Sequence, residues 1–281
     1  MAADAASSSG IEGEPRGRSL EHLAVARHWL PETSGKCWTV CHFRFPNWGA
    51  DIEPAIRSLM IGGVAFEEVR IDRNLGQWDE LKASGLCPYE QLPLLTFSQL
   101  EDPEKKMVLA QSNAINRVCG KRAGLMDASE PVRYAKIDEI LCAVQDLKQK
   151  FVASILQKDV ELKAKMRQLL IQDFVRPWLR HVEAVLSKNA AHFGAGFCVG
   201  PALSIADIAL DCVLSWFESG AMIGLDKETV KMSEFPLICA ARAKARDEPA
   251  IQARRESMAY HKETEWVLQQ TFRSSVSQGF D

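Results

Sequence analysis

The chain has 281 residues, of which 47% are hydrophobic and 25% are charged, and its formal net charge is −3. This length and composition suffice for a sizeable core in one large domain or two small ones. The weakly acidic balance gives no electrostatic footprint for nucleic acid or for an anionic membrane. The chain contains no run of about 18 apolar residues, so no membrane-spanning helix is expected.

Cysteine and histidine usage argues against a disulfide framework and a metal site. The eight cysteines are scattered through apolar patterns without a C-x-x-C pair, and the six histidines form no H-E-x-x-H or similar cluster. Scattered buried thiols are typical of a reduced, cytosolic protein. Residues 1–15 have neither the basic nor the apolar region of a signal peptide. We therefore expect a cytoplasmic protein that holds no metal.

The first half of the chain predicts a β-α-β unit after an N-terminal arm. Residues 1–35 are rich in Ala, Ser, Gly and Glu, which predicts disorder with at most a short helix. The β-branched and aromatic run 37–45 predicts a strand, and a helix follows from about Glu53. A glycine pair ends that helix before the strand 64–71. A strand, a short helix and a second strand predict a right-handed parallel crossover.

The stretch 91–125 predicts a β-hairpin followed by a helix. Two short apolar runs flank a charged turn, and a helical period begins after Gln111 and Ser112. The Ser112 hydroxyl is well placed to cap the helix. The helix N-terminus could also bind a ligand carboxylate beside Gln111 and Ser112. From the spacing alone, both interpretations of Ser112 stay open, and Pro93 could simply shape the start of its strand.

The second half of the chain predicts helices throughout. A helical period runs from Val132 to Ile155, and a charged stretch, 158–165, precedes another helix over about 166–186 that is interrupted near Pro177. Ser204 with Asp207 three residues later resembles a capping box at the start of a strongly apolar helix. The expected organisation is an arm, a mixed α/β domain, a linker, an all-helical domain and a tail: 1–35, 36–125, 126–131, 132–257 and 258–281.

These motifs together resemble the cytosolic glutathione S-transferases, with the sigma-like branch of prostaglandin D synthases and S-crystallins as the most similar group. The shared features are an X-Pro-x-Leu strand, a hairpin, Q-S-x-A-I at the head of a helix, a Trp-x-x-x-Lys pair and F-x-V-G before S-x-A-D. The resemblance covers roughly residues 37–256. It implies a thioredoxin-like domain (βαβ-ββα) followed by an all-α helical bundle. The missing C-x-x-C argues against a disulfide oxidoreductase.

The resemblance also implies a glutathione site. Leu92 would offer its backbone to the cysteine of glutathione, Pro93 would be cis, and the Gln-Ser pair would hold the γ-glutamyl carboxylate. The glycine carboxylate would lie at Trp78 and Lys82, with Gln91 nearby. The expected glutathione-binding positions are Phe45, Trp78, Lys82, Gln91, Leu92, Pro93, Gln111 and Ser112. Taken alone, a lysine at helical spacing is usually a solvated surface residue, and it is the fixed spacing of Lys82 from Trp78 and Pro93 that favours a ligand role.

The catalytic position departs from the family pattern. The family's Y-F-N-x-R-G-R-A-E-P aligns without a gap on F-P-N-W-G-A-D-I-E-P, which places Phe45 where the thiol-activating tyrosine stands and retains neither arginine. A phenylalanine ring cannot hydrogen-bond a thiolate. His42 is a candidate donor, and Arg44, Asn47 and Cys87 are weaker ones. The catalytic residue is therefore unknown from the sequence.

Two functions remain open at this point. The first is a transferase or isomerase in which bound glutathione attacks a small electrophile, as in detoxification. The second is a non-catalytic binding or assembly module built on the same fold. The resemblance implies a homodimer in either case, in which Asp146 from the partner subunit would reach glutathione. Retained ligand positions favour the first function, whereas Phe45 and the added terminal segments favour the second.

Overall fold

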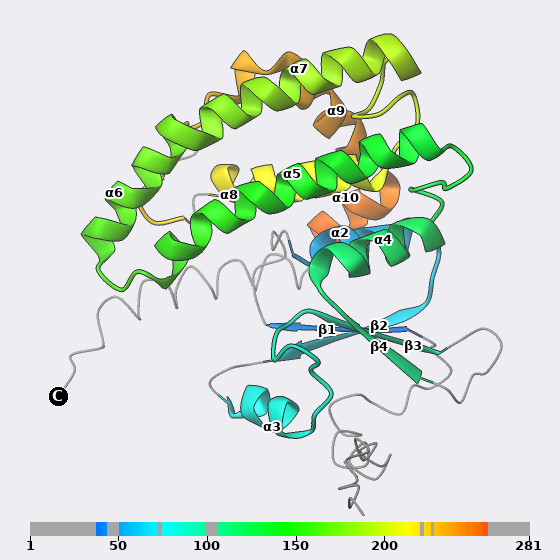
Figure 1. Cartoon of the computed structure of the whole chain (residues 1–281), viewed down its shortest axis with the longest axis vertical. Coiled ribbons are helices and arrows are strands. Elements are labelled where there is room, and N and C mark those ends of the chain that lie inside the picture. Colours follow the sequence, from blue (N-terminus) through cyan, green and yellow to red (C-terminus); the bar gives the residue numbers. More distant parts are fainter. Residues whose placement is uncertain are drawn as a thin grey trace, which may run out of the picture.

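A computed structural model describes residues 38–43, 51–71, 75–98, 106–219, 222–225 and 228–257. A four-stranded sheet lies at one end of the molecule and a group of long helices at the other (Figure 1). The strands follow the order β2-β1-β3-β4. Their bounds are β1 Trp38–Phe43, β2 Phe66–Ile71, β3 Leu94–Ser98 and β4 Lys106–Ala110. β1 pairs with β2 in parallel and with β3 antiparallel, and β3 pairs with β4 antiparallel.

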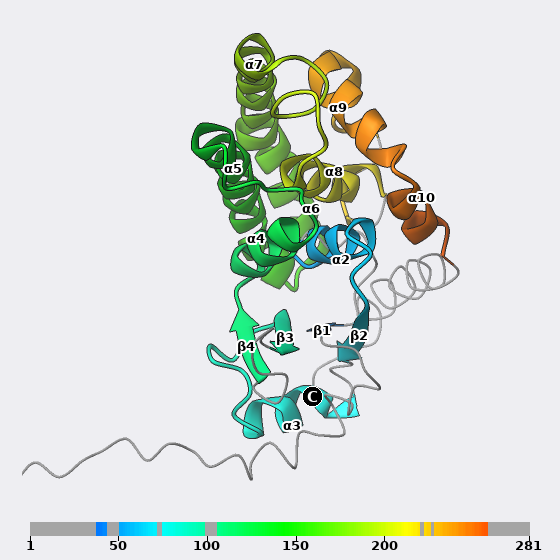
Figure 2. The same cartoon turned by 90° about the vertical axis from the view of Figure 1, so that its right-hand side faces the viewer.

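Three helices cover the two faces of the sheet. Helices α2 (Glu53–Ile61) and α4 (Ser112–Arg122) lie on the face toward the helical part, and α3 (Gln77–Ala83) lies on the other face (Figure 2). The β1 side chains alternate between the two faces, as a strand requires: Val40 packs with α2 and α4, whereas Cys41 packs on the α3 side. This arrangement is the expected βαβ-ββα order, so the thioredoxin-like fold class is confirmed.

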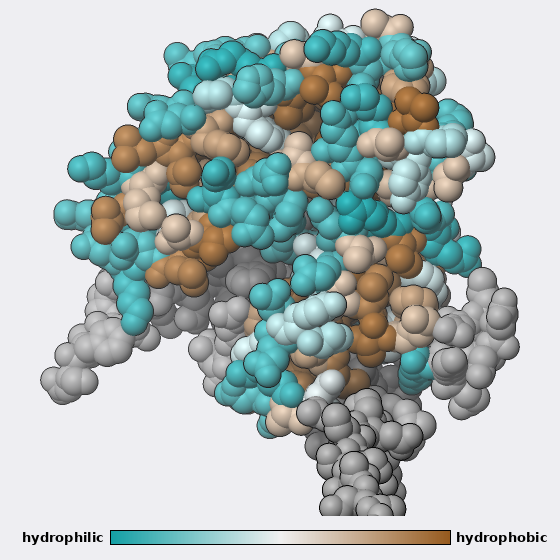
Figure 3. All heavy atoms as spheres, viewed as in Figure 1, coloured by the Kyte–Doolittle hydropathy of each residue, from teal (hydrophilic) through white to brown (hydrophobic). Residues whose placement is uncertain are grey.

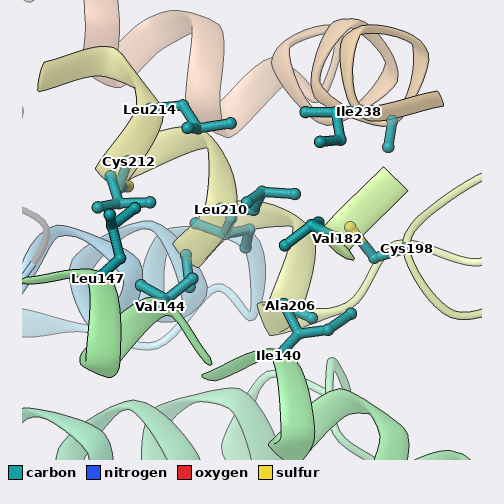
Figure 4. Packing of buried hydrophobic residues seen from close by; sticks show 14 of the residues in the cluster. Ile140, Val144, Leu147, Val182, Cys198, Ala206, Leu210, Cys212, Leu214 and Ile238 are labelled. Carbon is teal, nitrogen blue, oxygen red and sulfur yellow. The ribbon is translucent and has the colours of Figure 1, made fainter. Parts of the chain in front are cut away.

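The remaining helices form the bundle above the sheet. Their bounds are α5 Pro131–Leu156, α6 Val160–Leu170, the π-helical turn η2 Ile171–Val175, α7 Arg176–Phe193, α8 Ile205–Glu218, the 3-10 turn η3 Met232–Glu234, α9 Pro236–Arg246 and α10 Pro249–Glu256. Helix α8 is buried along almost its whole length and packs against α5. Figure 4 shows this core, where Val144 and Leu147 of α5 approach Leu210 and Cys212 of α8.

The start of α8 forms as its sequence predicts. Asp207 accepts hydrogen bonds from the backbone N–H of Ser204 at 2.9 Å and from that of Cys198 at 2.6 Å. Burial raises the pKa of Asp207 above its usual value, although these hydrogen bonds oppose the change. The expected pairing of Ser204 with Asp207 is therefore present, and it also holds the loop that precedes α8.

Two helix boundaries differ from the expectations. The charged stretch after α5 is already helical from Val160, because the Asp159 side chain accepts a hydrogen bond from the N–H of Leu162 at 2.9 Å and caps α6. The interruption expected near Pro177 is the π-helical turn η2, which ends one residue before α7. Pro177 then lies in the first turn of α7, where its missing N–H is tolerated.

A buried ionic network joins the sheet end to the helical bundle. Arg57 of α2 is fully buried and donates to Asp211 of α8 at 2.9 Å and to Glu53 at 3.1 Å. Asp211 also accepts from Arg242 and Arg246 of α9, at 3.2 and 2.6 Å. Burial would raise the pKa of Asp211, but the surrounding arginines outweigh it and hold that pKa below its usual value. α2 is therefore fixed to the bundle by charge pairs as well as by packing.

The surface of the bundle carries apolar side chains at the junction of α5 and α6. Figure 3 shows them as brown spheres on the left side of the molecule, over α6 and the adjoining end of α5. The exposed members are Val152, Ile155, Leu156, Val160, Leu162 and Leu169. Among the helices that the structure describes, none has the length and apolar content needed to cross a membrane.

Candidate functional site

The predicted ligand positions converge at one end of the sheet. Leu94 pairs with Ala110 and with Cys41. Pro93, just before β3, therefore lies beside Gln111, just after β4, and Phe43 at the end of β1 lies beside Leu92. Leu92, Phe43 and Trp78 all pack against the same small core. The ends of three strands (β1, β3 and β4) and the start of α4 thus meet around one potential binding surface.

The segment before β3 has the geometry that the resemblance implies. The Leu92–Pro93 peptide bond is cis. Pro93 is buried, Leu92 is half-buried and Gln91 is exposed. Since β3 starts at Leu94, the backbone groups of Leu92 lie just outside the sheet ladder. The carbonyl oxygen can accept a hydrogen bond from an extended peptide-like ligand, and the N–H group can donate one to it.

The turn from β4 into α4 differs from the expected serine cap. α4 begins at Ser112, and Gln111 occupies the N-cap position with φ of 75° and ψ of 113°. This left-handed backbone is rare for a residue other than glycine and costs on the order of 1–3 kcal/mol. The Gln111 side chain makes no capping hydrogen bond. The interpretation of Ser112 as a helix cap is therefore wrong.

The start of α4 is consequently open to a ligand. Ser112 is half-buried, and no hydrogen bond of its hydroxyl is recorded within the described parts of the chain. The first N–H groups of a helix have no partner inside the helix, and they carry a partial positive charge. An exposed Gln111 side chain, the Ser112 hydroxyl and these N–H groups together suit a carboxylate.

Trp78 and Lys82 lie on the same side of α3. The Trp78 ring meets the Phe43 ring edge to face, with 5.0 Å between the ring centroids. Lys82 Nζ lies 5.5 Å from the Trp78 ring centroid and 2.9 Å from the exposed carboxylate of Asp79. The pair with Asp79 is a surface pair, which contributes little to stability. Lys82 can therefore turn toward an anionic ligand at low free-energy cost.

His42 belongs to a different environment. It is buried on the face of β1 toward α2, with Nε2 2.9 Å from Glu68 Oε1 and Nδ1 2.6 Å from the carbonyl oxygen of Phe43. Both ring nitrogens are therefore occupied by protein oxygens. His42 is not available in this arrangement as a hydrogen-bond donor to a thiolate.

The other suggested donors add little. Burial raises the pKa of Cys87 to about 11, and the charge of Glu90 acts in the same direction. The Cys87 thiol is therefore protonated near neutral pH. Phe45, Arg44 and Asn47 lie outside the described residues. Asp146 is exposed on α5, and no hydrogen bond or ion pair of it is recorded within the described chain.

One charged pair between the bundle and the residue before the α2 N-cap has no counterpart among the sequence predictions. Lys148 of α5 donates to Asp51 Oδ1 at 2.8 Å. Asp51 immediately precedes Ile52, the N-cap residue of α2. The two residues are 97 positions apart, and each belongs to a segment of unremarkable composition. No local pattern in the sequence indicates that they meet.

Comparison with protein families and with curated proteins gives a match of each kind. The family model described as "Glutathione S-transferase, C-terminal domain" matches residues 145–257. The curated protein glutathione S-transferase P 1 of Xenopus laevis is 36% identical over 138 residues, which is 47% of this chain and 56% of that protein. The chain thus spans little more than half the length of this relative.

Solved structures share the whole arrangement of sheet and bundle. Prostaglandin synthase D of Nilaparvata lugens matches with a TM-score of 0.62 at 24% identity, over 79% of this chain and 98% of that chain. The sigma class glutathione S-transferase of Fasciola hepatica matches with a TM-score of 0.62 at 19% identity, over 78% and 95% of the two chains. At these identities the likeness shows the fold.

Proposed function

The chain belongs to the glutathione S-transferase family, and on that premise we propose that it binds glutathione and transfers it to, or uses it to isomerise, a small electrophile. The observation that carries the proposal is the open start of α4 next to the cis Leu92–Pro93 bond. Both lie at the end of the sheet where Trp78 and Phe43 also meet.

Each part of glutathione has a chemically suitable partner in this arrangement. The γ-glutamyl carboxylate would bind Gln111, Ser112 and the first N–H groups of α4. The cysteinyl backbone would pair with Leu92. The glycine carboxylate would be met by Lys82 and by the indole N–H of Trp78, with Gln91 at the exposed rim. The thiol would then point toward the end of β1 and the start of α2.

We further propose a cytoplasmic homodimer that uses no metal. Asp146 is exposed on α5, so it could reach the glutathione of a partner subunit. The electrophile would lie against the helical bundle, whose α5 and α6 expose apolar side chains. The arm 1–35 and the tail 258–281 stay outside this proposal. We propose only that these two segments flank two domains, 36–125 and 132–257.

The second candidate function is a non-catalytic binding or assembly module. It is favoured by Phe45, which replaces the family's tyrosine, and by the engagement of both His42 ring nitrogens with protein oxygens. Removing one hydrogen-bond donor of this kind lowers a rate by about 100-fold or more, whereas binding is less affected. A protein that keeps the glutathione site without turnover would fit this description.

Retention on immobilised glutathione, followed by a conjugation assay with chlorodinitrobenzene, separates the two functions. A transferase is retained and forms the conjugate above the rate without protein. A binding module that keeps the site is retained but forms none. If the folded protein is not retained on immobilised glutathione, or if free glutathione does not elute it, the proposed site is contradicted.

A further inference from the structure

Lys148 is a buried lysine at the boundary between the sheet end and the bundle. Its side chain is only 6% exposed, and its Nζ donates to Asp51 Oδ1 at 2.8 Å, whereas the Asp51 side chain is 60% exposed. Lysine is rarely buried to this degree, because removing its ammonium group from water is unfavourable. A charge held in such a place acts on its surroundings through a lower dielectric than a surface charge does.

The position of Lys148 follows from the path of α5. Asn113, in the first turn of α4, donates its side-chain N–H to the carbonyl oxygen of Leu141 at 3.5 Å. Lys148 is about two turns, or about 10 Å, further along α5. There it contacts Asp51 just before α2. α5 therefore passes from the start of α4 to the start of α2.

Both of those helices follow strands that end at the same end of the sheet as the candidate glutathione site. α4 begins directly after β4, and α2 is the helix that follows β1. The ends of these strands frame the cis Leu92–Pro93 segment. Lys148 thus brings a positive charge from the helical bundle to the side of the site where the thiol would lie.

We propose that Lys148 stabilises the thiolate of bound glutathione, a role that rests on the proposed function. The S–H bond breaks, the proton passes to water, and the sulfur keeps the electron pair that later forms the carbon–sulfur bond. A positive charge within a few ångströms favours the thiolate over the thiol. In the gapless alignment of the family motif, this chain has neither the tyrosine hydroxyl nor the arginines. Lys148 would supply a positive charge from α5 in their place.

The charges around Lys148 determine how strong this effect is. From the start of α2, the Asp51 carboxylate opposes the thiolate and competes for the ammonium group. Glu53 on the same helix is held by Arg57 and Arg254. From α8, Asp211 is held by Arg57 as well as by arginines of α9. Asp51 is therefore the acid whose removal should strengthen the influence of Lys148.

The test measures ionisation of the bound thiol and not turnover. Glutathione is bound to the full-length protein, and the ultraviolet absorbance of the thiolate near 240 nm is followed against pH. The variants are Lys148→Met, Lys148→Arg and Asp51→Asn. Lys150→Met, on the exposed side of α5 and beside Phe174, is the matched control.

We expect Lys148→Met and Asp51→Asn to change the ionisation constant of the bound thiol in opposite directions. Lys148→Met should lower the ionisation constant of the bound thiol about tenfold, and Lys148→Arg should restore most of it, since the charge is kept. Asp51→Asn should raise the ionisation constant, and Lys150→Met should leave it unchanged. Because Asp51 is largely exposed, this variant tests the proposal even if Lys148→Met does not fold.

Two failures can be told apart. If wild-type protein does not bind glutathione, the proposed function is wrong and this inference is wrong with it. In the second case, wild type and the folded variants all bind glutathione, but the ionisation constants of the bound thiol agree within a factor of two. Glutathione binding then stands, and Lys148 has no role in activating the thiol.

Discussion

Arg254 in α10 binds both carboxylate oxygens of Glu53 in α2, through Nε and Nη2, each at 3.1 Å. The two residues are 201 positions apart, and the bond fixes the last described helix to the first helix of the sheet end. The same guanidinium also donates to Glu68 of β2. Such two-pronged pairs between arginine and carboxylate are the strong members of their class.

Removal of this guanidinium should destabilise the protein strongly. Arg254→Met leaves the buried carboxylate of Glu53 and the partly buried carboxylate of Glu68 with one partner fewer, and breaking a buried pair in this way costs roughly 3–5 kcal/mol. Urea unfolding gives the change in the free energy of unfolding. The neighbouring Arg255→Met is the control, because Arg255 is one-third exposed and 3.9 Å from Asp211. Equal losses in both variants would contradict the importance of the Arg254 pair.

The acid side of the stability profile should depend on Glu68. Burial would raise the pKa of this carboxyl, but hydrogen bonds with His42 and Arg254 outweigh burial and hold the pKa well below its usual range. A carboxyl with a depressed folded-state pKa stabilises the protein fully above its unfolded value of about 4.3, and the contribution is lost as the pH falls through its folded value.

The experiment compares Glu68→Gln with wild type between pH 7 and pH 3. The difference in unfolding free energy should be largest above about pH 5 and should shrink as the pH falls below about 4. Glu67→Gln, whose side chain leaves the opposite face of β2, should show no such trend. A Glu68→Gln difference that stays constant down to pH 3 would rule out this linkage.

Ser112 should affect glutathione binding without affecting stability. Its hydroxyl caps nothing in the described chain, so Ser112→Ala should leave the unfolding midpoint within experimental error. Loss of a hydrogen bond to a charged carboxylate costs about 1.5–3 kcal/mol, which predicts a 10- to 100-fold weaker complex. Ser187→Ala, an exposed serine on α7, serves as the control. Unchanged affinity in Ser112→Ala would remove the serine from the site.

Asp146 should matter only in the assembled protein. Because it is exposed on α5, Asp146→Ala should not disturb the fold of one subunit. In a dimer confirmed by sedimentation, it should weaken glutathione binding several-fold through the loss of a partner contact. An affinity equal to that of wild type in such a dimer would show that the partner subunit does not use this residue.

The local elements of the fold could be predicted because their signals lie close together in the sequence. The β1 strand, the helix start at Glu53 and the pairing of Ser204 with Asp207 each depend on residues within one or two turns of each other. The cis bond at Pro93 was expected from the family resemblance. The sequence predicts the start of α6 too late, because the capping residue Asp159 lies in a charged stretch that shows no apolar period.

Contacts between distant segments could not be predicted in this way. Lys148 meets Asp51 only because α5 crosses the sheet end, and Arg57 reaches Asp211 over 154 positions. The engagement of His42 by Glu68 also depends on the parallel pairing of β1 with β2. A strand pattern predicts that pairing but does not show which side chains it brings within hydrogen-bond distance.

Isothermal titration of glutathione into the full-length protein tests the central claim most directly. The account predicts saturable binding at one site per subunit, weakened 10- to 100-fold by Ser112→Ala and unaffected by Ser187→Ala. Absence of binding to wild-type protein that unfolds cooperatively would contradict the account, because the open start of α4 and the cis Leu92–Pro93 segment would then hold no glutathione.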